Sequence, residues 1–322
     1  MPDSFINMTF PQNGIDRAMG FSSQRGGTTP LGHNVRTFDP RTDRARGAQR
    51  SGLTRHIDAK VNGAALIQEL MLLVGVGYTP PGGGSVQSST SGRVVTLVAI
   101  SGGALYVANA GDTAWTAATN SSGSSPGITS GIPVMSAVNN MQLWIVDGTH
   151  MRVYDPATNV LSAWTASAGS LPHDNANYPR LIETWRGRTF LSGISSDPQN
   201  WFLTRVSDPT DFDTNPALPS PDQAIFGNNS PLGLIGDVVT CFIPFSDDVA
   251  IVGGDHSIYL FNGDPMAGGQ IDLVNDGIGM VWGRPWCRGP DGMVYFFSNR
   301  MAIFSIAPGQ QPSASASRSR PC

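Results

Sequence analysis

Charged residues are scarce in this sequence, and two of the four common charged types are almost missing. They make up 14% of the 322 residues, Lys60 is the single lysine, and Glu69 and Glu183 are the only glutamates. A helical bundle draws on Ala, Leu, Glu and Lys, so this composition disfavours one. The 38 glycines and 24 prolines instead favour short strands joined by tight turns.

Cysteine and histidine are too scattered to indicate a site. Cys241, Cys287 and Cys322 are widely spaced and odd in number, which argues against a disulfide framework or a zinc-binding spacing. The five histidines form no HxH or HExxH motif, and the sequence has no G-x-S-x-G, P-loop or dinucleotide-binding motif. We therefore expect no catalytic residue, no cofactor and no metal ion.

Long hydrophobic runs are lacking as well. The most apolar stretch, residues 64–78, is short for a membrane span and is interrupted by Gln68 and Glu69, so it predicts a buried strand or a short helix. The first residues, MPDSFINMTFPQNG, have neither the basic nor the apolar region of a secretory signal. We expect a soluble chain without membrane contact.

What the sequence does contain is a recurring rhythm of short apolar strands and tight turns. It occurs five times, over residues 102–115, 140–164, 186–212, 246–265 and 289–309. Asp-Gly and Gly-Asp steps between alternating strands favour two-residue hairpins, because they supply the positive φ that such turns need. The units recur about every 40–50 residues, with one longer interval, which is the spacing of propeller blades. The sequence thus predicts an all-β fold, a β-propeller with about five or more blades of short antiparallel strands. A sandwich or two β-domains is the structural alternative.

The two ends of the chain lack this rhythm. Residues 1–60 have no hydrophobic period and are interpreted as an extended N-terminal arm, either laid across another surface or disordered. Residues 61–310 are predicted to form the propeller body, in which the Pro- and Gly-rich segment 213–237 is an insertion over one face. Residues 311–322 are interpreted as a low-complexity tail.

Aspartates gather in the stretch GISSDPQNWFLTRVSDPTDFDT, residues 193–214. Asp before Pro favours an extended or turn conformation, and its side chain accepts bonds from the following amides. We therefore predict four structural turn residues: Asp155, Asp197, Asp208 and Asp264. A calcium loop is the sharper alternative, but the stretch lacks a glycine at the sixth position and a glutamate at the twelfth. A glycosidase site is another, and the sequence singles out no pair of converging carboxylates.

Arginine is concentrated near the start of the chain. Nine of the 20 basic residues and five of the 24 acidic ones fall in residues 1–60, which leaves eleven basic and nineteen acidic residues in the rest. Arginine at this density pairs with carboxylates of another protein or with phosphates. We predict protein–protein docking through Arg36, Arg41, Arg44, Arg46, Arg50 and Arg55. Contact with a DNA backbone and a solvated arm remain the alternatives.

Four segments resemble bacteriophage tail β-propeller proteins. They are GGTTPLGHNVRTFDPRTDRARGAQRSGL, DPQNWFLTRVSDPTDFD, SDDVAIVGGDHSIYLFNGDPMAGGQID and GIGMVWGRPWCRGPDGMVYFFSNRMAIFSI. The resemblance is to the nozzle or tail-tube proteins of short-tailed phages. It implies a structural virion protein that is assembled in the host cytoplasm as a ring below the portal and adaptor.

The resemblance also implies the partners: copies of this chain, the portal, adaptor or other tail proteins, and phage DNA that passes through the channel without specific binding. A net-negative body fits that last role, because it repels phosphate. Relatives tend to be longer, so either an N-terminal strand closes the propeller or further blades are missing.

Two other functions remain open. One is a propeller that binds or cleaves carbohydrate on the host surface, and the other is an accessory protein of the phage head.

Overall fold

The computed structural model describes most of the chain beyond residue 56. The described residues are Ser23, residues 26–27, Val35–Arg36, Ala48–Gln49, Ile57, and residues 59–74, 95–109, 112–121, 127–227 and 235–314. By its internal contacts the chain divides into two units, Met1–His56 and Ile57–Cys322, so the boundary falls four residues before the predicted one.

The first unit contains one short antiparallel pair. In it β1 (Val35–Arg36) runs against β2 (Ala48–Gln49), with Val35 opposite Gln49. Apart from Ser23, residues 26–27, Ile57 and residues 59–60, the other parts of the predicted arm lie outside the described residues.

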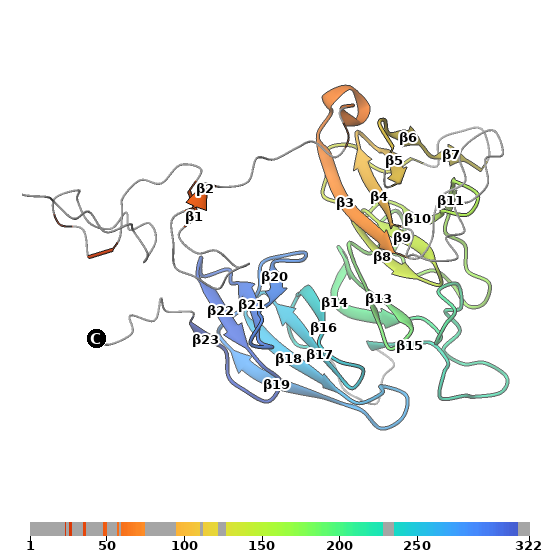
Figure 1. Cartoon of the computed structure of the whole chain (residues 1–322). Helices are drawn as coiled ribbons and strands as arrows, with labels where there is room; N and C mark the ends of the chain where they lie inside the picture. Colours follow the sequence, from red (N-terminus) through yellow and green to blue (C-terminus); the bar gives the residue numbers. More distant parts are fainter. Residues whose placement is uncertain are drawn as a thin grey trace, which may run out of the picture. The chain divides into compact units, whose positions relative to one another are not determined.

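The second unit is built from five consecutive β-sheets, which we number as blades 1 to 5 (Figure 1). Blade 1 contains β3 (Ile67–Val74), β4 (Val95–Ser101), β5 (Ala104–Asn109) and β6 (Thr116–Ala117), preceded by the 3-10 turn η2 (Val61–Ala64). Blade 2 contains β7 (Thr119–Asn120), β8 (Met135–Asn139), β9 (Gln142–Val146), β10 (Met151–Asp155) and β11 (Val160–Ala163).

The remaining three blades each have four strands. Blade 3 contains β12 (Leu181–Trp185), β13 (Arg188–Ile194), β14 (Asp197–Leu203) and β15 (Ile225–Phe226). Blade 4 contains β16 (Val239–Pro244), β17 (Val249–Gly254), β18 (Ser257–Asn262) and β19 (Gln270–Asp276). Blade 5 contains β20 (Trp286–Arg288), β21 (Val294–Phe297), β22 (Ile303–Ile306) and β23 (Ser313–Ala314).

Strand order identifies the fold as a β-propeller. Within each blade the strands pair antiparallel in sequence order, apart from β7, which joins the outer edge of blade 2 parallel to β11. The first strand of each of blades 1 to 3 contacts the first strand of the next blade in the chain. The strands that meet in this way are β3, β8, β12 and β16. Radial blades whose first strands face a common axis are the arrangement of a propeller, as the sequence predicted.

Two-residue turns set the register of the inner hairpins. Asn140 and Met141 between β8 and β9 have φ of 51° and 59°, and Arg186 and Gly187 between β12 and β13 have φ of 54° and 70°. Positive φ at both turn positions matches the right-handed twist of the strands that flank the turn. In blades 2 and 3 these turns therefore hold the first strand tightly against the second.

Hydrophobic clusters fill the spaces between successive blades. Leu105 of blade 1 packs with Leu143 and Tyr154 of blade 2, and Trp201 of blade 3 lies 5.1 Å, ring to ring, from Phe261 of blade 4. Blades 4 and 5 share a third cluster, which includes the fully buried Cys241. Among the described residues no buried cluster joins blade 5 to blade 1, and on β3 the side chains of Leu70 and Leu72 are more than half exposed.

The structure adds detail to three sequence predictions. Residues 64–78 contribute a strand rather than a helix, but this strand is buried on one face only. The predicted insertion 213–237 contains β15, which pairs with β14 as the outer strand of blade 3, because residues 224–226 are apolar. The predicted tail contains β23, which pairs with β22, so no N-terminal strand takes the outer position of blade 5 among the described residues.

We expect Phe190→Ala to lower the free energy of unfolding by about 3–5 kcal/mol, because it empties a packed site between two blades. Phe190 is fully buried on β13 and stacks on Phe242 of β16 with ring centroids 3.8 Å apart. Urea denaturation measures the loss. The matched control is Phe297→Ala on β21, where the residue is 43% exposed. Equal losses in the two variants would contradict the proposed packing.

Candidate functional site

Only one of the six arginines predicted for docking, Arg36, is among the described residues. Arg36 ends β1 and lies opposite Ala48. The other five, Arg41, Arg44, Arg46, Arg50 and Arg55, lie outside the described residues. Docking through these side chains therefore stays a prediction.

Three of the four predicted turn aspartates bond to residues two or three positions further on. Asp155 accepts a hydrogen bond from the amide of Ala157, and Asp208 accepts from both the amide and the hydroxyl of Thr210. Asp197, at the start of β14, accepts from the side chain of Asn200 at 2.9 Å. These carboxylates satisfy local donors rather than converging on a common point.

Asp264 does more than shape a turn. Its carboxylate accepts from the amide of Met266 at 2.9 Å, and it also lies 3.5 Å from Nε of Arg186 and 3.8 Å from Nη2 of Arg188. Since both arginines belong to blade 3, this aspartate of the blade 4 hairpin links two blades. Arg188 is fully buried and donates further bonds to the carbonyl oxygens of Thr204 and Gln223.

A polar cluster lies where the first strands of the blades meet. Arg284, just before β20, donates from Nε to Glu183 on β12 at 2.8 Å and from Nη1 to Glu69 on β3 at 3.2 Å. Its Nη2 donates to the carbonyl oxygen of Ser136 on β8. We call Arg284, Glu69, Glu183 and Ser136 the axial cluster.

The axial cluster, together with the residue before Arg284, touches every blade. Arg284 itself reaches blades 1, 2 and 3, while the amide of the preceding Gly283 donates to the carbonyl oxygen of Thr240 on β16 at 2.9 Å. The guanidinium thus offers its donors to strands that share no backbone ladder with one another. A planar group with five fixed N–H donors suits such a junction better than a lysine.

Burial makes Glu69 an unusual carboxylate. Desolvation raises its pKa to about 7, although Arg284 and the amide of Ser136 act in the opposite direction. Burial acts to lower the pKa of Arg284, but Glu183 and Glu69 outweigh it and the net shift is upward. Oε2 of Glu69 and Oγ of Ser136 find no hydrogen-bond partner among the described residues.

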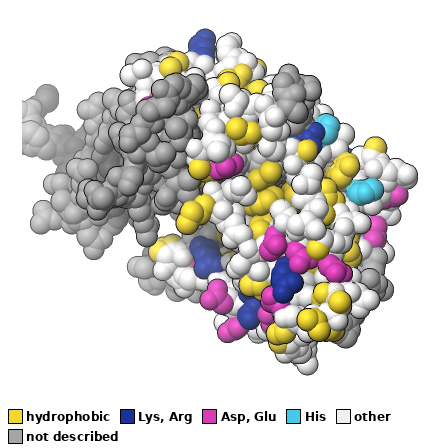
Figure 2. All heavy atoms as spheres, turned by 90° about the vertical axis from the view of Figure 1, so that its right-hand side faces the viewer, with side chains coloured by type: hydrophobic (Ala, Val, Ile, Leu, Met, Phe, Trp, Pro, Cys, Tyr) yellow, Lys and Arg dark blue, Asp and Glu magenta, His cyan; other side chains and the backbone are white. Residues whose placement is uncertain are grey.

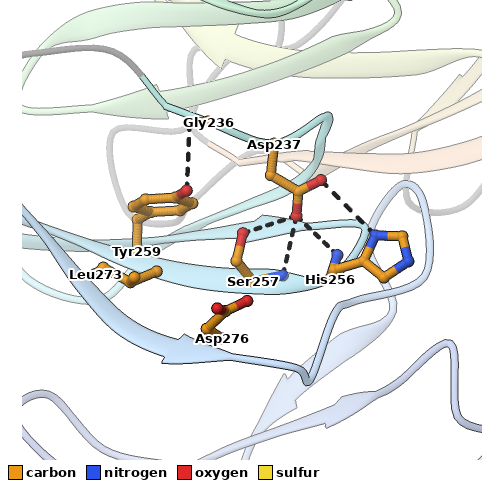
Figure 3. A pocket seen from close by; sticks show the side chains of 7 residues that line it. All are labelled: Gly236, Asp237, His256, Ser257, Tyr259, Leu273 and Asp276. Carbon is orange, nitrogen blue, oxygen red and sulfur yellow. Dashed lines mark hydrogen bonds and ion pairs between the residues drawn. The ribbon is translucent and has the colours of Figure 1, made fainter.

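A second polar arrangement is a cavity of about 370 Å³ on blade 4 (Figure 3). Ser257 and Tyr259 on β18 lie opposite Asp276 and Leu273 on β19, so these four side chains share one face of the sheet. Gly236 and Asp237, which precede β16, lie across from them, and His256 completes the lining.

Asp237 organises one wall of this cavity. It accepts hydrogen bonds from the amides of Val238, His256 and Ser257 and from the Ser257 hydroxyl, over distances of 2.7–2.9 Å. Burial acts to raise the pKa of Asp237, but these donors outweigh it and lower the pKa overall. The hydroxyl of Ser257 therefore donates directly to a carboxylate with no imidazole between them, since His256 Nδ1 lies 4.0 Å from Asp237. This geometry suits binding of a polar or positively charged group rather than activation of Ser257 as a nucleophile.

The sequence singled out neither arrangement. Arg284, Glu183 and Asp276 lie in no motif, and their neighbours come from strands far apart in the chain. One signal was available for the axial cluster, because the only two glutamates of the chain both belong to it. In the part of the chain that the structure describes, no group of three or more His, Cys, Asp or Glu side chains is placed to hold a metal ion.

Comparison with known proteins gives structural similarity alone. No protein-family model matches this chain, and no curated protein matches it either. Among solved structures, the extracellular domain of a putative hybrid two-component system from B. thetaiotaomicron aligns with a TM-score of 0.47 at 10% identity. That alignment covers 83% of this chain and 35% of the other.

Two further structures align less closely. YCF48 bound to D1 peptide gives a TM-score of 0.43 at 7% identity, with 66% of this chain and 61% of that one covered. A chain of the nidogen/laminin complex gives 0.37 at 10% identity, with 74% and 89% covered. This chain therefore spans about a third of the first structure and about three fifths of the second, and its own strand order carries the fold assignment. Over the described ranges, no helix has the length and apolarity that a bilayer crossing requires.

Glu69 predicts a pH dependence of stability. Its pKa is higher in the folded chain than in the unfolded one, so between about pH 4.5 and 7 the folded state binds the extra proton. The stability that this carboxyl contributes is therefore fully present below about pH 4.5 and is lost as the pH rises to about 7, by up to roughly 3 kcal/mol.

The measurement is urea denaturation of the wild type and of Glu69→Gln across pH 4.5 to 8. The free energy of unfolding of the wild type, taken relative to that of Glu69→Gln, should fall steadily between about pH 4.5 and 7 and level off above about pH 7. A difference that stays constant with pH would contradict the burial of an ionisable Glu69.

Proposed function

We propose that this chain is a structural, non-catalytic subunit of a bacteriophage tail, similar to a nozzle or tail-tube protein. In this role copies of the chain form a ring below the portal and adaptor and continue the channel through which the genome leaves. The proposal starts from the resemblance of four sequence segments to tail propeller proteins. The observation that carries it further is how the body uses its acidic side chains.

Those side chains serve the rigidity of the body. Asp155 and Asp208 tie turns, Asp264 joins two blades, and both glutamates are held by Arg284. A scaffold subunit needs such fixed geometry. Because Arg284 occupies the meeting point of the first strands, DNA in this proposal passes through the centre of a ring of copies and not along the axis of one propeller.

Charge supports the same role. Residues 61–322 carry eleven basic and nineteen acidic residues, and such a body repels the phosphates of passing DNA. Figure 2 shows Asp and Glu side chains gathered beside Lys and Arg on part of one face, rather than a continuous basic surface. The Arg-rich segment 1–60 supplies the opposite charge with which neighbouring copies or the adaptor are held together.

A carbohydrate-binding propeller is the second candidate, and the cavity on blade 4 favours it. An aromatic ring, Tyr259, stands there beside the carboxylate of Asp276, which are groups that a sugar ring can use. A glycan array with the purified chain separates the two functions, because the tail proposal expects no glycan to be retained.

Removal of residues 1–56 tests the tail proposal. We expect the full chain to form a ring and the shortened chain to stay a monomer, because the arginines that hold copies together are gone. The shortened chain should keep its melting temperature, since the hydrophobic clusters lie in the second unit. Native mass spectrometry measures the assembly, and particle composition in an infected host measures incorporation.

The control for this deletion replaces only Arg36, Arg41, Arg44, Arg46, Arg50 and Arg55 with glutamine in the full chain. It should lose assembly to a similar degree, and raising the salt concentration should weaken the wild-type ring. Normal incorporation of the shortened chain into particles would contradict the docking role.

A further inference from the structure

The cavity on blade 4 carries an unbalanced negative charge. Two of its lining residues are aspartates, and neither a lysine nor an arginine lines it. Asp237 is already occupied by four donors of its own chain, whereas the carboxylate of Asp276 forms no hydrogen bond or ion pair with any described residue. A free carboxylate beside a fixed one, at the mouth of a cavity, is a site for a cation with several N–H donors.

We propose that this cavity binds the guanidinium group of an arginine in the N-terminal segment of a second copy of this chain. The inference rests on the proposed function, since it requires copies of the chain to associate. It goes further in naming the surface on which the arm docks and the chemical group that is recognised.

The positions of the side chains fit a guanidinium. Asp276 lies opposite Ser257 across the β18–β19 ladder, and Asp237 lies on the other side of Ser257, so the two carboxylates face the cavity from two sides (Figure 3). A guanidinium has donors on two edges and binds carboxylates through paired hydrogen bonds. One edge reaches the free oxygens of Asp276, while the charge of Asp237 stabilises the cation from across the cavity.

The other half of the cavity suits the rest of an arginine side chain. Tyr259 lies opposite Leu273 in the same ladder, and its hydroxyl accepts a hydrogen bond from the amide of Gly236 at 3.2 Å, which fixes the ring. Guanidinium groups stack on aromatic rings, and the methylene stem of an arginine packs on apolar surface such as the exposed Leu273. A volume of about 370 Å³ is at the lower end for small-ligand sites, which is appropriate for one side chain.

Charge complementarity selects the occupant. Eight of the nine basic residues in residues 1–60 are arginines, so the segment offers guanidinium groups and hardly any ammonium groups. Among the described residues, the side chain of Arg300 comes close to Gly277, the residue that follows Asp276. It forms no ion pair with Asp276 within the described part of the chain, so the carboxylate stays available.

The test uses the full chain and two measurements. The first is titration with N-acetyl-arginine amide as the probe, followed by calorimetry, with the uncharged citrulline analogue for comparison. The second is the dissociation constant of the assembly, from analytical ultracentrifugation. Asp276→Asn keeps the shape of the side chain and removes its charge, and Asp272→Asn is the matched control, because it makes the same change on the same strand outside the cavity.

We expect the wild type and Asp272→Asn to bind the arginine probe and not the citrulline one. Asp276→Asn should bind it at least about tenfold more weakly and should weaken the assembly by a similar factor. No binding of the arginine probe to the wild type overturns the site, whatever the assembly state. An assembly that Asp276→Asn leaves unchanged overturns the arm of a second copy as the occupant.

Two other results separate this inference from the function on which it rests. If the chain stays monomeric but binds the arginine probe through Asp276, the guanidinium site is supported and the ring is refuted. If the cavity instead retains a glycan and not the arginine probe, the inference is overturned in favour of carbohydrate binding.

Discussion

One arginine at the junction of the first strands is the interaction on which the second unit depends. Hydrogen-bond ladders hold each blade together, but among the described residues no ladder crosses from one blade to the next. Arg284 bridges this discontinuity with bonds to blades 1, 2 and 3, and its neighbour Gly283 bonds to blade 4. Glu69 is costly to bury as a carboxylate, and the arginine offsets that cost only while it stays in place. The raised pKa of Glu69 reflects this incomplete compensation.

The same junction connects the two ends of the propeller, blades 1 and 5, which are packed differently from the blades in the middle. Blades 2, 3 and 4 are covered on both faces by hydrophobic clusters, while blades 1 and 5 share no cluster with each other among the described residues. Their described connection is the polar one through Arg284 and Glu69. In the proposed tail subunit, rigidity therefore comes from the axis, and association comes from sites away from it. The cavity on blade 4 is such a site, since no residue of the axial cluster lines it.

Local chemistry allowed much of the fold to be predicted. Asp-Gly and Gly-Asp steps between apolar strands marked hairpins such as β9–β10 and β18–β19, and the spacing of the units gave the propeller. The first strands of blades 2 and 3 were harder to predict, because the turns Asn140-Met141 and Arg186-Gly187 carry a weaker signal than Asp-Gly. Short outer strands such as β15 and β23 were hidden in Pro- and Ser-rich segments, where pairing with a neighbouring strand overrides composition.

The candidate sites depended on contacts that sequence spacing does not encode. Arg284 meets Glu69 across 215 positions of the chain, and Asp237 meets Ser257 across 20. A bulge at Gln68 shifts the register of β3 immediately before Glu69, and no sequence motif predicts this bulge. The aspartate turns could be predicted because each carboxylate bonds within three residues, whereas the second role of Asp264 needed the neighbouring blade.

The most direct test of the central claim compares Arg284→Met with the triple variant Arg284→Met, Glu69→Gln, Glu183→Gln by urea denaturation at pH 8. If Arg284 holds the blades by compensating two largely buried carboxylates, the single variant loses about 1–3 kcal/mol of unfolding free energy, less than for a fully buried pair because Arg284 is partly exposed, and the triple variant recovers most of it. A single variant as stable as the wild type, or a triple variant no more stable than the single one, would contradict the account.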